Sequence, residues 1–224
     1  MSKPDDYYAN VNNTLLDICP TAGRVVEFGC GAGSTMRAYK ARNPDSFSLG
    51  VECFEDAAVL ARGIFDKVLT GDAEAIELSE HGYQEESFDL IIYGDVLEHF
   101  VDPWQTLDRH LKYLRSGGAV CACIPNASHW SVILGLLNGE FKYEDSGLLD
   151  RTHLRFFTFS SIKELMENAG LAISEVKSKV QSTPEQQNAL QLLSRLLDTQ
   201  GGAIPPVPQL NWSTFQYVVK AIKQ

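Results

Sequence analysis

The sequence contains no apolar run that approaches the roughly 18 residues a helix needs to cross a membrane. Its first residues, MSKPDDYYANVNN, also lack the succession of positive charge, apolar segment and small residues that marks a secretory signal. We therefore expect a cytoplasmic protein with no membrane span.

Cysteine is scarce, and its pattern matches no known framework. The five cysteines are an odd number, and no two of them form a C-x-x-C pair. This argues against both a disulfide framework and a structural zinc site. The thiols are expected to be reduced, and no metal centre is expected.

Positive charge is also in short supply. The chain has 19 Lys and Arg against 29 Asp and Glu, which gives a formal net charge of −10. No basic stripe interrupts this excess, which would repel a phosphate backbone. Nucleic acid is therefore not the expected partner.

Short apolar segments alternate with helical patterns over the first 125 residues. Because these segments are continuously apolar, they predict a parallel sheet covered on both faces, which is a doubly wound, three-layer α/β sandwich. The expected strands span 24–28, 47–52, 67–70, 88–94 and 119–124, and the expected helices 34–42, 55–64 and 103–115.

The rest of the chain fits the same single domain, residues 1–224. Ser161 and Glu164 have capping-box spacing and predict a helix over 160–169. The remaining expected parts are a leading amphipathic helix at 5–18, a substrate-side insertion at 125–158, a strand at 171–180, a Gly- and Pro-containing surface excursion at 181–211 with a helix at 189–198, and a last strand at 215–222.

The segment VVEFGCGAG, residues 25–33, places three glycines between a strand and a helix. Glycine permits positive φ and removes Cβ, so a ligand can approach the backbone at the start of the helix. In a dinucleotide fingerprint the third glycine would fall at Ser34, and no Y-x-x-x-K pair follows the fifth strand, which disfavours an NAD-linked oxidoreductase. Alone, the loop is equally compatible with an ordinary tight turn.

Acidic residues follow the next two strands. Glu52 ends the second strand, where a carboxylate can accept hydrogen bonds from both ribose hydroxyls. Asp72 follows the third strand, where it can accept from the adenine amino group while the Ala73 amide donates to a ring nitrogen. Each is also compatible with a solvated strand end, but together with the glycine loop they indicate a nucleoside site at the carboxyl edge of the sheet.

The fourth strand ends in FDLIIYGDVLEHFVDPW, which contains Asp95, Glu98 and His99. From residue 24 to about 180 the chain resembles class I S-adenosylmethionine-dependent methyltransferases, in the branch whose fourth strand ends in D-V-L-E-H. The resemblance implies a seven-stranded sheet with the last strand antiparallel and S-adenosylmethionine as cofactor.

The resemblance also implies the residues that hold the cofactor. Its carboxylate and amine lie near the glycine loop, where Glu27 orients the loop or contacts the amine, and its methionine part lies beside the fourth strand. Tyr8 is added to this set because an aromatic ring can pack against the positively charged sulfonium of the cofactor. The expected cofactor residues are Tyr8, Glu27, Gly29, Cys30, Gly31, Gly33, Glu52, Cys53, Asp72, Ala73, Asp95, Val96 and Leu97.

Methyl transfer is an in-line displacement, and a hydroxyl acceptor must also lose its proton. His99, His129 and His153 are the candidates for a base, and the alternative for each is a structural loop anchor. His81 and His110 are expected to be exposed. The expected substrate contacts are Trp130, Asp150 and Arg151.

The insertion resembles that of bacterial methyltransferases linked to surface-polysaccharide synthesis. This favours O-methylation of a sugar, polysaccharide precursor or other hydroxylated metabolite. The alternatives are N-methylation of a small molecule and a non-catalytic S-adenosylmethionine-binding module; a homodimer stays open. Asp95, Glu98 and Asp102 raise the question of a metal, which is disfavoured because Asp95 adjoins the cofactor and Asp102 leads into a helix at Pro103.

Overall fold

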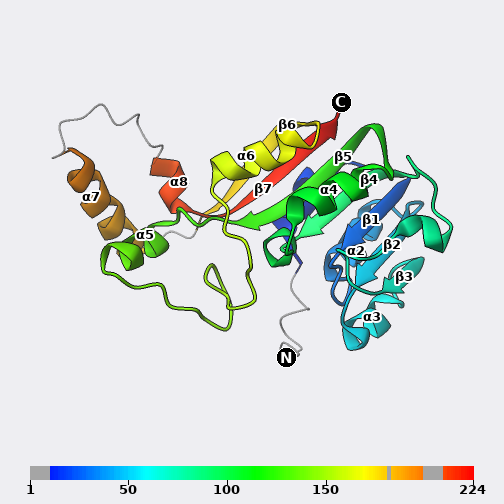
Figure 1. The fold of residues 1–224 in the computed structure, drawn as a ribbon, viewed down its shortest axis with the longest axis horizontal. Helices are drawn as coiled ribbons and strands as arrows, with labels where there is room; N and C mark the ends of the chain where they lie inside the picture. The colour runs from blue at the N-terminus through cyan, green and yellow to red at the C-terminus, as the bar shows by residue number, and fades with distance from the viewer. Residues whose placement is uncertain (1–10, 181–182, 199–208) are drawn as a thin grey trace.

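The protein is built around one seven-stranded sheet, seen in a computed structural model that describes residues 11–180, 183–198 and 209–224 (Figure 1). The strand order is β3-β2-β1-β4-β5-β7-β6. The strands are β1 (Arg24–Phe28), β2 (Phe47–Glu52), β3 (Lys67–Thr70), β4 (Phe88–Gly94), β5 (Leu114–Pro125), β6 (Leu171–Val180) and β7 (Thr214–Lys223).

The sheet is parallel from β3 to β5, and β7 runs antiparallel to both of its neighbours, β5 and β6. At its centre, Val26 of β1 pairs with Leu49 of β2 and Ile91 of β4. The doubly wound α/β fold with an antiparallel last strand is therefore confirmed.

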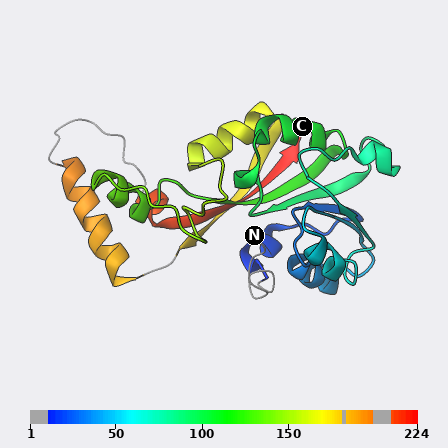
Figure 2. The same ribbon diagram turned by 60° about the horizontal axis from the view of Figure 1, so that its bottom comes forward.

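Helices cover both faces of the sheet, as Figures 1 and 2 show together. On one face lie α4 and α6, and on the other α1, α2 and α3. The helices of the described residues are α1 (Asn13–Ile18), α2 (Ser34–Arg42), α3 (Glu55–Ala61), α4 (Pro103–Leu111), α5 (Trp130–Leu137), α6 (Phe159–Asn168), α7 (Pro184–Asp198) and α8 (Gln209–Ser213), with short 3₁₀ turns η2 (Leu78–His81) and η3 (Leu97–His99).

The core divides into two apolar clusters because side chains alternate across each strand. In β4, Ile91 and Tyr93 enter the cluster beneath α4 and α6, while Leu90 and Ile92 enter the cluster beneath α1 and α2. All four side chains are fully buried. A sheet buried on both faces accounts for the continuous apolar strands of the sequence.

Several helix boundaries differ from the sequence-based expectation. The helix expected at 103–115 ends at Leu111. The leading helix expected at 5–18 begins only at Asn13, because Asn12 is its N-cap; residues 1–10 lie outside the described part of the chain. The predicted capping-box pair of α6, Ser161 and Glu164, is wrong. Thr158 is the N-cap and Ser161 the N3 residue, because the helix begins at Phe159.

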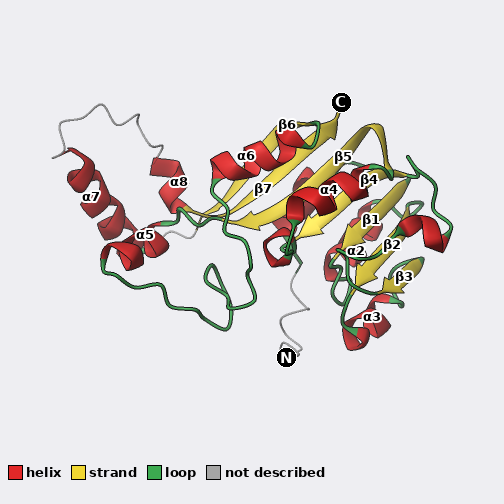
Figure 3. Ribbon diagram, viewed as in Figure 1, coloured by secondary structure: helices red, strands yellow, loops and turns green. Residues whose placement is uncertain are grey.

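The insertion and the surface excursion contain helices beyond the sheet (Figure 3). The insertion forms α5, which contacts α7 of the excursion, and both lie past the carboxyl end of β5 (Figure 1). The prediction of a single domain with these boundaries stays a prediction. None of the helices in the described residues is long and apolar enough to cross a membrane.

Candidate active site

The candidate site lies where the strand order reverses. β1 and β4 are neighbours at the centre of the sheet, but the chain leaves β1 towards β2 and β4 towards β5. The loops that follow two such strands diverge and leave a crevice at the carboxyl edge, which is the usual ligand position in this architecture. The glycine loop follows β1, and Asp95 follows β4.

The glycine loop uses backbone conformations that favour glycine. Gly29, Gly31 and Gly33 have φ of 67°, 53° and 84°. A Cβ atom on Gly29 would lie 2.6 Å from Val96 Cγ2, and one on Gly33 would lie 3.0 Å from Ile64 Cδ1. At Gly29 and Gly33 the loop is thus packed closely against its neighbours, and it presents backbone at the start of α2.

Glu52 holds the glycine loop in place. Its Oε2 accepts a hydrogen bond from Gly31 N at 2.7 Å, and its Oε1 accepts one from Phe54 N at 3.0 Å. The side chain is buried, with 5% of its surface exposed. Each carboxylate oxygen has two acceptor positions, and Oε1 also accepts from Cys53 Sγ at 3.5 Å, so Oε2 is the oxygen that keeps capacity for a ribose hydroxyl.

Glu27 is a buried carboxyl group with an unmet hydrogen-bonding capacity. Its Oε2 has no hydrogen-bond partner among the described residues. Burial, and then the nearby Glu52, raise the pKa of Glu27 to about 8. A buried acceptor that lacks a donor at the ligand edge fits a ligand with an ammonium group.

Asp95 joins three parts of the fold. Its backbone adopts φ 58°, which is uncommon for a residue with a Cβ. Its Oδ2 accepts from Asn12 Nδ2 at 3.2 Å, and its Oδ1 accepts from Gln216 Nε2. The sequence analysis missed Asn12 and Gln216. Asn12 carried a signal, because asparagine favours the N-cap position it occupies before α1, whereas Gln216 carried none.

The turn after β3 is held by α4. Asp72 is exposed and its Oδ1 accepts from Glu74 N at 2.9 Å, while the Ala73 carbonyl faces His110 Nε2 at 3.0 Å. His110 Nδ1 lies 2.9 Å from the Tyr93 hydroxyl. The Ala73 carbonyl, next to the expected adenine contacts, is therefore held by a buried histidine of α4.

The expectation that His110 is exposed is wrong. The residue is 2% exposed and stacks on Phe28, and burial lowers its pKa to about 3. It lies three residues after Leu107 and one before Leu111, on the buried face of α4. That helical spacing was a signal available in the sequence.

The candidate histidines fall into two groups. His129 caps α5, with Nδ1 2.9 Å from Ser131 Oγ, and its ring contacts those of Trp130 and Phe215. Burial lowers its pKa to about 4. Its Nε2 has no hydrogen-bond partner within the described part of the chain.

His99 and His153 lie together, with ring centroids 4.8 Å apart. His153 Nε2 is 4.0 Å from Glu98 Oε1. Burial, and then the charge of Asp95, raise the pKa of Glu98 well above its usual range. The fold thus places His153 of the insertion beside Glu98 and His99, which follow β4. His129 contacts other side chains.

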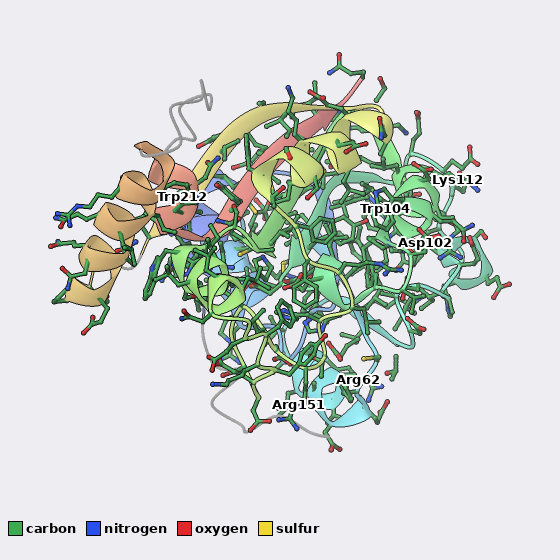
Figure 4. All side chains as sticks on the ribbon, turned by 60° about the vertical axis from the view of Figure 1, so that its left-hand side comes forward. Arg62, Asp102, Trp104, Lys112, Arg151 and Trp212 are labelled. Atoms are coloured by element: carbon green, nitrogen blue, oxygen red, sulfur yellow. The ribbon has the colours of Figure 1, made fainter. Side chains whose placement is uncertain are left out.

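The three expected substrate residues are arranged differently from one another. Asp150 is buried and accepts hydrogen bonds from the amide and the hydroxyl of Thr152 at 2.9 and 2.7 Å. Arg151 pairs with Asp145 at 2.8 Å and lies at the outer edge of the molecule (Figure 4). Trp130 lies beside His129 at the start of α5.

An open cleft of about 490 Å³ adjoins the histidine pair, and it is lined by Tyr143, Arg151, His153, Leu154 and Phe156. Phe141 contacts the rings of both Tyr143 and Phe156. Phe157, by contrast, belongs to the core. The other expected aromatic contact, Tyr8, lies outside the described residues.

The two cysteines of the expected cofactor set differ in exposure. Cys30 is buried, and its Sγ fills the space that a side chain at Gly50 would need. Cys53 is exposed, with Sγ 3.5 Å from Glu52 Oε1, and burial of part of its side chain raises its pKa to about 11. Both arrangements fit packing around the glycine loop.

A doubly wound sheet with this antiparallel last strand and a glycine loop at the switch point defines the class I methyltransferase fold. A family model described as a methyltransferase domain matches residues 4–176, and the chain belongs to that family. The matched domain is a methyltransferase domain, a class of enzyme domain whose cofactor is S-adenosylmethionine. The groups at the crevice fit this cofactor, since Gly29 and Gly31 are partly exposed and Glu27 Oε2 has no hydrogen-bond donor among the described residues.

Two curated relatives are named ubiquinone biosynthesis O-methyltransferase. The one from Hydrogenovibrio crunogenus is 24% identical over 73% of this chain and 64% of its own length, and the one from Nitrobacter winogradskyi is 27% identical over 73% and 62%. The chain therefore spans less than two thirds of the length of these relatives. A solved S-adenosylmethionine-dependent methyltransferase from Thermotoga maritima shares the fold, with a TM-score of 0.64, 22% identity, and 97% of this chain and 89% of that one covered.

Proposed function

We propose that this methyltransferase transfers a methyl group to an oxygen of a small hydroxylated molecule, such as a sugar or a related metabolite. The names of the curated relatives support an oxygen acceptor. The cleft beside His153 supports a small acceptor, since its lining of aromatic side chains and one arginine suits a polar ring.

The crevice residues would hold the ribose, the adenine and the methionine part of the cofactor. Glu52 faces the ribose hydroxyls, and the turn at Asp72 and Ala73 faces the adenine. Glu27 and the glycine loop face the amino acid end. Val96 and Leu97 of the turn after β4, with Asp95, border the methionine chain. Cys30 and Cys53 pack around the loop, and Tyr8 remains a proposed contact from its sequence position.

The enzyme's main task is alignment. When bound, S-adenosylmethionine supplies a methyl carbon on a positively charged sulfur, and in-line transfer to a hydroxyl oxygen leaves a neutral thioether and releases the hydroxyl proton. Trp130, Asp150 and Arg151 remain proposed contacts on the acceptor side. Of these, Arg151 lines the cleft and Asp150 orders the loop that carries His153.

One observation carries the proposal: a histidine that lines the cleft lies beside the turn after β4, which is part of the proposed cofactor site. His153 lines the cleft, and Glu98, 4.0 Å from it, follows Asp95 by three residues. We assign loss of the acceptor proton to the side chains at this junction, His99 and His153. His129 has the buried environment of a helix cap, and burial lowers its pKa to about 4, which makes it a weak base.

The test is methyl transfer from cofactor labelled in its methyl group to a panel of sugars, phenols and amines. We expect label in an ether of a hydroxylated acceptor, and H153A should lower the rate at least about 100-fold, the scale of a lost proton-transfer group. The exposed His81 provides the matched control, H81A, which should keep the wild-type rate. Label that appears only in amines, or equal rates in H153A and the wild type, would contradict the proposal.

A further inference from the structure

Three side chains from two distant segments of the sequence converge beside the cleft, which one of them lines. Glu98 and His99 belong to η3 directly after β4, and His153 comes from the insertion. One potential ligand atom from each residue lies within 4.8 Å of the other two. Two imidazoles and a carboxylate form a typical three-residue ligand set for a divalent metal.

The two imidazoles are held in the orientation that metal ligands adopt. His99 Nδ1 lies 3.0 Å from the Thr152 carbonyl oxygen, and His153 Nδ1 lies 3.1 Å from the Leu148 carbonyl oxygen. A carbonyl only accepts, so each neutral ring donates from Nδ1 and carries its lone pair on Nε2. Metal-binding histidines are commonly fixed in this way by a second hydrogen bond to a backbone carbonyl.

One oxygen of the buried Glu98 carboxyl group, in this cluster, has no hydrogen-bond donor among the described residues. The side chain is 1% exposed, and its Oε2 has no hydrogen-bond partner among residues 11–180, 183–198 and 209–224. Asp95 and Asp150 contribute further negative charge around it. A buried carboxylate is costly unless it is paired or coordinates a metal, so this environment favours a bound cation.

The backbone holds the two segments together without help from these side chains. The Glu98 carbonyl oxygen accepts hydrogen bonds from Leu154 N at 2.8 Å and Arg155 N at 2.9 Å. The residue after His153 is therefore attached directly to the turn that carries Glu98 and His99. Such a fixed arrangement lowers the cost of assembling a ligand set.

We propose that Glu98, His99 and His153 bind one divalent first-row transition-metal ion beside the cleft. Two ligands about 2.1 Å from one ion in tetrahedral geometry are about 3.4 Å apart. His153 Nε2 and Glu98 Oε1 are 4.0 Å apart and the ligand atoms of the cluster all lie within 4.8 Å of one another, so side-chain movements of about 0.6 to 1.4 Å complete the site. Two nitrogen ligands favour Zn²⁺, Co²⁺ or Mn²⁺ over Mg²⁺, which prefers oxygen ligands.

The role of the ion rests on the proposed function. Three protein ligands leave coordination positions for another group, and because His153 lines the cleft, an acceptor hydroxyl in the cleft would lie near the ion. A cation there lowers the pKa of that hydroxyl, and its proton passes to solvent. With the ion bound, His99 and His153 promote loss of the acceptor proton as ligands of the ion, and not as the base that takes the proton.

The test uses protein freed of metal by dialysis against a chelator. Zn²⁺, Mn²⁺ and Mg²⁺ are titrated separately by calorimetry, and Co²⁺ is added to record its visible absorption spectrum. We expect one ion per chain, with Zn²⁺ bound more tightly than Mn²⁺ and Mg²⁺ most weakly. E98Q and H153A should each raise Kd at least about tenfold and alter the Co²⁺ spectrum, while H81A should match the wild type.

Binding of S-adenosylhomocysteine by each variant shows that it is folded. Equal metal affinity and an unchanged Co²⁺ spectrum in folded E98Q and H153A would overturn the metal site, whether or not methyl transfer proceeds. If the ion binds as expected but no hydroxyl is methylated, the proposed acceptor class fails and the metal site stands.

Discussion

At the scale of single residues, the site depends on positions where a small chemical change has a large local effect. Gly29 has no room for a methyl group, Glu27 lacks a donor, and Asp95 holds a positive φ. Each of these features lies at the same edge of the sheet. Together they explain why this edge, and not another, is suited to a ligand.

Gly29 is expected to tolerate no side chain. G29A adds a Cβ atom 2.6 Å from Val96 Cγ2 at φ 67°, whereas the matched control G82A adds one at φ 86° with no atom within 4 Å. G82A should lower the free energy of unfolding by about 1 kcal/mol. G29A should cost about 1–3 kcal/mol more and weaken S-adenosylhomocysteine binding. Urea denaturation and calorimetry measure both, and equal effects of the two substitutions would contradict the close packing of the loop.

Glu27 should give the folded protein a measurable pH dependence. Its pKa is about 8 in the fold against an ordinary value of 4.5. Between these pH values the folded chain keeps a proton that the unfolded chain has released, so the free energy of unfolding falls as pH rises. The slope from this group is at most about 1.4 kcal/mol per pH unit.

The measurement compares urea denaturation of the wild type and E27Q from pH 5 to pH 8. E27Q cannot titrate, so the wild type should lose stability relative to E27Q as pH rises. Parallel profiles would show that Glu27 ionises normally in the fold.

At the scale of elements, the turn after β3 depends on α4. The Glu74 carboxylate accepts from Val101 N at 2.7 Å and Asp102 N at 2.9 Å, just before α4 begins. His110 holds the Ala73 carbonyl from the other end of the same helix. The position of the proposed adenine contacts is thus set by one helix at two points.

H110L tests this support. Leucine fills most of the space but leaves the Ala73 carbonyl and the Tyr93 hydroxyl without their partner, which should cost about 2–5 kcal/mol of stability. Because the pKa of His110 is about 3 against an ordinary 6.5, the unfolded chain binds a proton first, so the wild type should lose stability relative to H110L as pH falls below 6.5. Denaturation at pH 5 and pH 7 measures both effects; the exposed-residue control H81A should stay within about 0.5 kcal/mol of the wild type.

If H110L keeps wild-type stability and wild-type affinity for S-adenosylhomocysteine, His110 does not support the turn. If it loses stability at both pH values by equal amounts, the buried histidine titrates normally. Either outcome would contradict the arrangement described for α4.

The strands were predictable because each is a short apolar segment bounded by turn residues. β1 to β4 match their expected ranges, and β5 is longer than expected because its first residues pair with Phe88 across a bulge. Helix ends were less predictable. Several hydroxyl side chains near the start of α6 can cap a helix, and the sequence does not show that Thr158 is the N-cap and Ser161 its partner. The helix α5 was not predicted, because its sequence is apolar on most sides and lacks a clear helical period.

At the scale of the whole molecule, the site combines local and long-range parts. The glycine loop, Glu52 and Asp72 are predicted for the site from the sequence because each lies at or just after the end of a strand. The packing of His153 against Glu98 and the contacts of Asn12 and Gln216 with Asp95 were not found. These depend on how the insertion, α1 and β7 fold back on the sheet, which residue spacing does not encode.

The central claim is that the crevice at the carboxyl edge of β1, β2 and β4 binds S-adenosylmethionine through Glu52 and the glycine loop. Calorimetric titration of S-adenosylhomocysteine into the wild type, E52A and E55A tests it most directly. Glu55 is the control, an exposed glutamate three residues on that pairs with Arg62. The account predicts one ligand per chain for the wild type and E55A, and at least about tenfold weaker binding for E52A, since loss of its charge-assisted hydrogen bonds costs about 1.5–3 kcal/mol. Equal affinity in folded E52A and the wild type would contradict it.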